Sequence, residues 1–391
     1  MDLTQIQSAI REEGLDGWLF FDHHHRDPLA YRILDLHHAG LASRRWYYFI
    51  PATGEPRALV HAVEPKALDE LPGTKQVYSA WKTQRDGLTT LLNGARRVAM
   101  QFSPNCAVPL VSMVDGGTID LIRSCGIEVA TSADLIQRFD ARWTKEQVET
   151  HFEAGRRIDE IRAAAFKHVG DVLRGLGAID EYAVKVFVLE AFEKAGLLTD
   201  HGPVAAVNAN ISNPHYEPQS TGSSPIKRGD VLLMDMWAKL NTPGAVFYDI
   251  TWVGFCGAVV PDEVTKVFTI VRDARDRAFE LVRDRVAAKQ PLRGFEVDDA
   301  ARNHIAENGY AEYFVHRTGH SIGEDVHGTG ANMDNLETHD ERKVIPGTCF
   351  SVEPGIYLPH FGIRSEFNVF VSETEAKVTG ASQAELIRVI D

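Results

Sequence analysis

The sequence is poor in cysteine, with four in 391 residues. No two of them form a Cys-x-x-Cys pair, and long stretches of chain separate Cys106, Cys125, Cys256 and Cys349. A disulfide framework or a zinc ribbon needs cysteines that recur at short, regular spacings. The sequence therefore argues against both and predicts buried free thiols.

Long apolar runs are also missing. No run approaches the roughly 18 residues that a membrane span requires. The first residues, MDLTQIQSAIREEG, lack the charged and then apolar pattern of a signal peptide. We therefore expect a cytoplasmic protein with no membrane partner.

Positive charge is in deficit, because 55 acidic residues face 41 lysines and arginines, and the formal net charge is −14. Nucleic-acid binding needs a basic face, and the sequence shows none. We expect no nucleic-acid partner, and metal ions or small cationic ligands suit this charge better. The length predicts two to three domains.

The chain changes character near residue 143. Before it, helical and strand-like patterns alternate, with strands expected at 17–22, 45–50 and 58–63, which indicates an α/β domain. Residues 139–143 have the composition of a linker. Thr144 and Gln147 then form a capping-box pattern ahead of two amphipathic helices. We therefore predict one domain over 1–143 and a second over 144–391.

Two glutamates stand out in residues 347–371, GTCFSVEPGIYLPHFGIRSEFNVFV. The β-rich runs 348–358 and 362–371 flank a short turn, which predicts a hairpin. Glu353 lies in the first run and Glu366 in the second, each among apolar residues. An unpaired buried carboxylate is costly. Either both side chains face solvent, or a positive group lies between them.

A second acid-bearing hairpin is expected earlier in the chain. Asp235 lies within the apolar run VLLMDMW, and Asp249 lies within AVFYDITWVGF. One aspartate in a strand is usually at an edge or a turn. Two in paired strands can reach one face of the hairpin, where they repel each other unless a cation lies between them.

Three histidines lie between these hairpins, in YFVHRTGHSIGEDVHGTG: His316, His320 and His327, interleaved with four glycines. Such glycines indicate unusual turns or backbone packed closely against a ligand. Carboxylates with a single imidazole suit Mn²⁺, Co²⁺ or Zn²⁺, and carboxylates can bridge two ions. Two bridged ions are a recurrent device of hydrolytic enzymes. The ligand set of this type is Asp235, Asp249, His320, Glu353 and Glu366.

In their order and their motifs, these five residues resemble the metal ligands of the pita-bread metallopeptidases. The motifs are TGHSIGEDVH around His320, EPGIY from Glu353 and GIR ahead of Glu366. The chain resembles the branch that contains prolidase (Xaa-Pro dipeptidase), aminopeptidase P and creatinase, and it is most similar to prolidase. The resemblance implies an α+β fold: a C-terminal pita-bread domain with a curved antiparallel sheet, an N-terminal α/β domain of creatinase type, and a homodimer.

The resemblance also implies roles for individual residues. Two divalent ions per subunit, Mn²⁺ with Co²⁺ or Zn²⁺ as alternatives, are held by the five ligands. Glu353 acts as general base for the water that bridges the ions, since a carboxylate can take a proton and later deliver it. His327 and His215 hold the scissile carbonyl or the substrate carboxylate and stabilise the tetrahedral intermediate. His316 and Arg364 line the substrate pocket.

The leading prediction is a dinuclear peptidase that hydrolyses Xaa-Pro dipeptides. An Xaa-Pro aminopeptidase (aminopeptidase P) and a dipeptidase of relaxed specificity are the alternatives. A creatinase-like amidinohydrolase works without metal, and a binding module that has lost catalysis is expected to lack ligands. The complete ligand set disfavours both.

The sequence departs from the family's pattern around Asp235. The family usually has Asp-x-Gly with a tyrosine soon after, whereas this chain has Met236 and Trp237. Asp249 follows 14 residues after Asp235, a longer spacing than is usual. Val207-Asn208-Ala209 replaces Ala-Ser-Gly, and Phe367 replaces an aspartate. A longer hairpin tip can reshape the substrate pocket, so these departures keep a dipeptidase of relaxed specificity open as an alternative.

Overall fold

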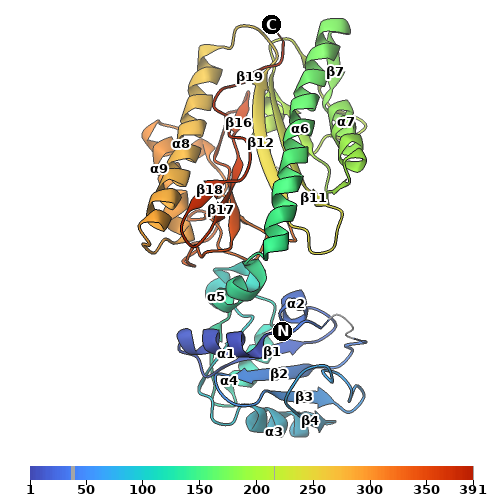
Figure 1. The fold of residues 1–391 in the computed structure, drawn as a ribbon, viewed down its shortest axis with the longest axis vertical. Coiled ribbons are helices and arrows are strands. Elements are labelled where there is room, and N and C mark those ends of the chain that lie inside the picture. Colours follow the sequence, from blue (N-terminus) through green and yellow to red (C-terminus); the bar gives the residue numbers. More distant parts are fainter. Residues whose placement is uncertain (37–39, 215, 391) are drawn as a thin grey trace. The chain divides into compact units, whose positions relative to one another are not determined.

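The computed structural model describes residues 1–36, 40–214 and 216–390. The chain divides into two compact units, Met1–Asp140 and Ala141–Asp391, and each is described by itself (Figure 1). Within the described ranges, no helix is long and apolar enough to cross a lipid bilayer.

The first unit is built on a six-stranded mixed sheet with helices on both faces. The sheet order is β4 (Thr74–Tyr78), β3 (Arg57–His61), β2 (Trp46–Pro51), β1 (Gly17–Asp22), β5 (Arg97–Met100) and β6 (Glu128–Thr131). Alternate residues of β1 point to opposite faces, so Trp18 and Phe20 join one apolar core and Leu19 and Phe21 the other. The first core also contains residues of α1 (Leu3–Glu12), α2 (Pro28–Leu34) and α5 (Ala133–Ile136), and the second those of α3 (Trp81–Leu91) and α4 (Gly116–Arg123).

The segment expected to be a linker is ordered into regular structure. Residues Gln137–Ala141 form one π-helical turn. Trp143 is buried within the second unit, where its Nε1 donates a hydrogen bond to the Ile322 carbonyl at 3.2 Å and its ring stacks on Phe370. The division between the two units falls within the predicted linker, after Asp140, and the Trp143 indole anchors the start of the second unit.

Two pairs of helices flank the strands of the second unit. They are α6 (Lys145–Gly175) with α7 (Glu181–Lys194), and α8 (Asp262–Ala287) with α9 (Gly294–Glu307). Figure 1 shows the first pair on one side of the strands and the second pair on the other. The predicted capping box is confirmed: Gln147 N donates to Thr144 Oγ1 at 3.2 Å, and Thr144 N donates to Gln147 Oε1 at 2.9 Å.

The strands of the second unit form two main sheets. The first has the order β19 (Ile387–Arg388), β12 (Tyr248–Phe255), β11 (Val231–Leu240), β8 (Leu197–Leu198), with β9 (Val204–Val207) also paired to β11. The second has the order β13 (Ser321–Ile322), β14 (Cys349–Val352), β17 (Phe367–Val371), β18 (Ala376–Val378). Two further pairs are β7 (Ala178–Asp180) with β10 (Pro225–Lys227) and β15 (Gly355–Tyr357) with β16 (Gly362–Arg364). The Asn368 side chain joins the two main sheets, because it donates to the Asp249 carbonyl at 2.6 Å and accepts from Asp249 N at 3.0 Å.

The predicted glutamate hairpin is present, but each of its strands is broken in two. Strand β14 pairs with β17 and β15 pairs with β16, and Glu353 and Glu366 lie in the two gaps. The Glu353 N–H donates to the Thr318 carbonyl at 2.7 Å, and the Glu366 N–H to the Thr251 carbonyl at 3.1 Å. These two backbone hydrogen bonds therefore connect the glutamates to the segments that carry the histidines and Asp249.

All four cysteines are free thiols, as predicted. Burial is confirmed for Cys256 and Cys349, while Cys125 is half-buried. Cys106 is exposed, so the prediction of a buried thiol is wrong there.

One buried histidine makes the stability of the second unit depend on pH. His151 Nδ1 lies 2.6 Å from the Phe247 carbonyl and donates to it, so Nε2 of the neutral ring accepts from Thr379 Oγ1 at 2.8 Å. Burial lowers the pKa of His151 from 6.5 to about 4. Between these values the unfolded chain binds a proton that the folded chain does not, so stability falls as the pH drops through this range.

We expect this histidine to contribute a loss of about 2 kcal/mol in unfolding free energy between pH 7.5 and pH 5. The measurement is denaturant unfolding of the wild type and of His151→Gln, whose amide keeps a donor and an acceptor without titrating. The difference in unfolding free energy between the wild type and His151→Gln should shrink by that amount between pH 7.5 and pH 5. A difference independent of pH would contradict the lowered pKa.

Candidate active site

Strands β11 and β12 bring the two aspartates to one face, which confirms that prediction. Asp235 is paired with Thr251, and Trp237 with Asp249, so all four side chains leave the same face of the ladder. Farther along β11, that face carries Leu233 into the apolar core of α8 and α9. The opposite face packs against α6 and α7 through Met234, Met236 and Ile250.

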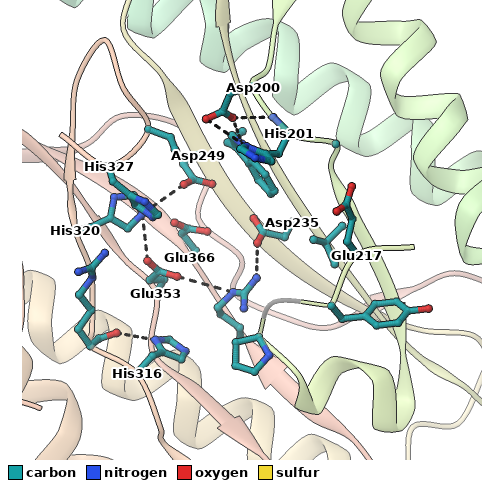
Figure 2. A pocket seen from close by; sticks show the side chains of 18 of the residues that line it. Asp200, His201, Glu217, Asp235, Asp249, His316, His320, His327, Glu353 and Glu366 are labelled. Atoms are coloured by element: carbon teal, nitrogen blue, oxygen red, sulfur yellow. Dashed lines mark hydrogen bonds and ion pairs between the residues drawn. The ribbon is translucent and has the colours of Figure 1, made fainter. Parts of the chain in front are cut away.

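His320 and the glutamates close on this face from the second sheet (Figure 2). His320 Nε2 lies 3.6 Å from Asp249 Oδ2 and 3.4 Å from Glu353 Oε1. Ligand atoms of Asp249, His320 and Glu366 all lie within 4.8 Å of one another. All five candidate ligands line one cavity of about 480 Å³, a size suited to a small-molecule substrate.

Neighbouring side chains hold the carboxylates but leave two oxygens free. Thr251 Oγ1 donates to Glu366 Oε2 at 2.8 Å, and Ser351 Oγ donates to Glu353 Oε1 at 3.0 Å. Arg364 donates to Asp235 Oδ2. Asp235 Oδ1 and Glu366 Oε1 are buried and accept no hydrogen bond from any described residue. Buried oxygens without a partner are costly, so these residues fit a bound cation.

The charges of the site lead to the same conclusion. Burial raises the pKa of Asp235 to about 7 and raises the pKa values of Asp249 and Glu366 well above their ordinary range. Repulsion among the carboxylates adds to this effect, and Arg364 opposes it. For Glu353, burial also acts upward, but His320, His316 and Arg364 outweigh it and lower the pKa. Crowded buried carboxylates are an environment that a divalent cation stabilises.

A chain of hydrogen bonds runs from His316 to Asp235. His316 Nδ1 donates to the Arg317 carbonyl at 2.7 Å, so Nε2 of the neutral ring accepts from Tyr357 Oη at 2.7 Å. Burial lowers the pKa of His316 and favours this neutral form. Tyr357 Oη in turn accepts from Arg364 Nη1 at 3.2 Å.

The guanidinium of Arg364 is engaged by the protein itself. It donates to Tyr357, to Asp235 and, from Nε at 3.0 Å, to Thr251 Oγ1, and the residue is only 5% exposed. Arg364 lines the cavity, as the resemblance implies. Its hydrogen bonds nevertheless orient Asp235 and Thr251 and do not leave it free to grip a substrate carboxylate.

Of the other two predicted histidines, the structure describes His327 but not His215. His327 lies at the cavity with its ring edge-on to that of His320, the centroids 4.3 Å apart. The neighbouring His320 lowers the pKa of His327. His215 lies outside the described residues, although Pro214 and Tyr216 line the cavity.

Three cavity residues that the sequence did not predict are Arg317, Asp200 and Trp237. Tyr357, which donates to His316, was not predicted either. Arg317 follows His316 within HRTGH, and this motif was the available signal. Its backbone N–H donates to Glu337 Oε1 at 3.0 Å, its side chain forms no ion pair with the described carboxylates, and its charge contributes to lowering the pKa of Glu353. For Asp200 and Trp237, the sequence offered no indication of a role other than the unusual residues that follow Asp235.

The chain belongs to metallopeptidase family M24, whose model matches residues 151–373 and so includes all five candidate ligands. This match confirms the prediction of a pita-bread metallopeptidase. It also confirms that the protein is a peptidase.

Curated relatives and a solved structure are consistent with this family. The chain is 29% identical over 347 residues to "Probable dipeptidase PepE" of Mycobacterium tuberculosis (strain ATCC 25618 / H37Rv), covering 86% of this chain and 84% of the relative. It is 30% identical over 258 residues to "Xaa-Pro dipeptidase" of Pyrococcus furiosus, covering 65% of this chain and 67% of that protein. The structure of dipeptidase PepE from Mycobacterium ulcerans has the same fold, with a TM-score of 0.70, 23% identity and coverage of 100% of this chain and 97% of that one.

Proposed function

We propose that the protein is a dinuclear metal-dependent dipeptidase that hydrolyses Xaa-Pro dipeptides and acts as a homodimer. The observation that carries the proposal is the cavity in which four carboxylates and one imidazole converge, with two buried carboxylate oxygens left without a described donor. The residues that would hold two divalent ions, with Mn²⁺ preferred over Co²⁺ or Zn²⁺, are Asp235, Asp249, His320, Glu353 and Glu366. When bound, such ions polarise the scissile carbonyl and lower the pKa of the attacking water.

Glu353 is the residue that we assign to proton transfer. Ser351 holds one of its oxygens at 3.0 Å, and the other lies 4.0 Å from Arg364 Nε, so the carboxylate has a defined orientation inside the cavity. It accepts a proton from the attacking water and delivers that proton to the leaving nitrogen. The hydroxyl of the water forms the new carboxylate, and the proline nitrogen, which carries no hydrogen in the peptide, leaves as a secondary amine.

The remaining polar residues bind and orient the substrate. His327 and His215 are assigned to the scissile carbonyl, where a histidine N–H stabilises the developing oxyanion. Arg317 is assigned to the substrate carboxylate, because it is the cavity guanidinium that is not engaged by a described carboxylate. His316 acts through Tyr357 and Arg364 to orient Asp235.

Arg317 also favours a dipeptidase over an aminopeptidase. A cation in the same cavity as the candidate metal ligands suits a carboxylate that lies one residue beyond the scissile bond. In a longer peptide, that position is occupied by a neutral peptide group. The free carboxylate of a dipeptide therefore gains an interaction that a tripeptide does not.

The test is to remove bound metal with a chelator, add back Mn²⁺, Co²⁺ or Zn²⁺, and assay Ala-Pro, Ala-Leu and Ala-Pro-Ala. We expect Ala-Pro to be hydrolysed only with metal, at a kcat/KM at least about tenfold above that of either other peptide. Equal rates on Ala-Pro and Ala-Pro-Ala would favour the aminopeptidase alternative, and equal rates on Ala-Leu would indicate relaxed specificity. No metal-dependent hydrolysis of any of the three would refute the proposal.

A further inference from the structure

One wall of the cavity carries Trp237 of strand β11. The pairing of β11 with β12 ends at Ala238 and Tyr248, but β11 continues to Leu240. Its last residues pair with β8, where Lys239 lies opposite Leu198. Asp200 follows β8 two residues later. This pairing brings the segment of Asp200 beside Trp237.

Asp200 and Trp237 are joined directly. Trp237 Nε1 donates to Asp200 Oδ1 at 2.8 Å, and His201 N donates to the same oxygen at 2.9 Å. Trp237 is half-buried, and the Asp200 side chain keeps 44% of its surface exposed while lining the cavity. Burial acts to raise the pKa of Asp200, but the hydrogen bonds from Trp237 and His201 prevail and lower it. Asp200 is thus an oriented anion with an exposed edge.

The cavity is electrically asymmetric. The charge of Asp200 acts on Asp249 and the charge of Arg317 acts on Glu353, while both act on His327. Figure 2 shows Asp200 and His201 at one end of the drawn side chains and His316 at the other. A dipeptide whose carboxylate meets Arg317 therefore places its amino-terminal residue toward Trp237 and Asp200.

The α-amino group is a poor match for Asp200. It is two bonds from the scissile carbonyl carbon, a separation of about 2.5 Å, so it stays close to the candidate metal ligands. Trp237 occupies the position opposite Asp249, and its indole reaches from there to Asp200. A group that contacts Asp200 must extend along the indole, as the side chain of the amino-terminal residue does.

We propose that Trp237 and Asp200 form a specificity subsite that selects a cationic side chain, lysine or arginine, on the amino-terminal residue of the substrate. The inference rests on the proposed dipeptidase function and deepens it. The methylene stem of such a side chain packs on the indole face, and its charged end reaches the Asp200 carboxylate. Because Asp200 is partly exposed, salt weakens this attraction.

The experiment compares Lys-Pro with norleucyl-proline, which has the same four-carbon stem without the ammonium group. For the metal-loaded wild type at low salt, we expect kcat/KM to be about tenfold higher for Lys-Pro. This ratio should fall to about one in Asp200→Asn, should fall less in Trp237→Phe, which keeps the aromatic face without its donor, and should decrease with added salt. Glu385→Gln removes an exposed carboxylate outside the cavity and should keep the wild-type ratio.

Three results would overturn the inference: a wild-type ratio near one, the same ratio in wild type and Asp200→Asn, or an equal loss on both peptides in Asp200→Asn. The last would assign Asp200 to the α-amino group that both peptides share. If neither peptide is hydrolysed, the dipeptidase function fails, and calorimetric binding of lysine and norleucine to the metal-loaded protein tests the subsite by itself. Tighter binding of lysine that is lost in Asp200→Asn would support it, and equal binding would refute it.

Discussion

Replacing Glu353 by glutamine is expected to lower kcat for Ala-Pro by at least about 10³-fold. The amide preserves the shape of the side chain and an oxygen that can still face a cation, but it does not accept the proton of the attacking water. The position of residue 353 is set by its backbone hydrogen bond to Thr318 and by the hydroxyl of Ser351. Neither contact requires a charged side chain, so the variant should stay folded.

The measurement combines steady-state kinetics with a thermal melt and the metal content of the purified variant. Glu385→Gln is the matched control, since it makes the same chemical change at an exposed position outside the cavity and should retain wild-type kinetics. A Glu353→Gln variant that kept near-normal kcat would show that another group carries out the proton transfer.

The second large effect is expected for Asp249→Asn, which should abolish metal binding and lower activity by at least about 10³-fold while stabilising the metal-free protein. Ligand atoms of Asp249, His320 and Glu366 all lie within 4.8 Å of one another. The pKa of Asp249 is raised well above the ordinary range by burial, and Glu353 adds to the shift. Replacing the carboxylate by an amide therefore removes the cost of keeping a buried charge among other carboxylates, which Arg364 offsets only in part.

This prediction is specific because the substitution should stabilise the metal-free protein and abolish its stabilisation by metal. Without metal, the melting temperature of Asp249→Asn should exceed that of the wild type by a few degrees, since about 1 kcal/mol shifts it by roughly 2–4 °C in a unit of this size. With Mn²⁺ added, only the wild type should gain stability. A variant that binds Mn²⁺ normally, or that melts well below the metal-free wild type, would contradict the assignment of Asp249 as a ligand.

The candidate ligands could be predicted from sequence because their signals are local. Two carboxylates in strands of a hairpin share a face when their positions match the two-residue period, as the pairing of Trp237 with Asp249 shows. The glycine-rich motif around His320 and the acid in each apolar run are visible without knowledge of the fold. The helices followed from apolar periodicity and from the capping box at Thr144.

The rest depended on contacts between distant parts of the chain. The breaks that free Glu353 and Glu366 from their strands arise because Thr318 and Thr251 accept their backbone hydrogen bonds. The engagement of Arg364 by Asp235 joins positions 129 residues apart. Asp200 meets Trp237 only because β8 pairs with the end of β11. No local sequence pattern indicates such pairings. The sequence therefore predicted which residues are candidate metal ligands, but not which side chains surround them in the cavity.

The most direct test of the account is a titration of the chelated protein with Mn²⁺ while the hydrolysis of Ala-Pro is followed. We expect no hydrolysis without metal and activity that saturates when two ions are bound per chain. Hydrolysis by the metal-free protein at the saturated rate, or full activity with a single ion, would contradict it.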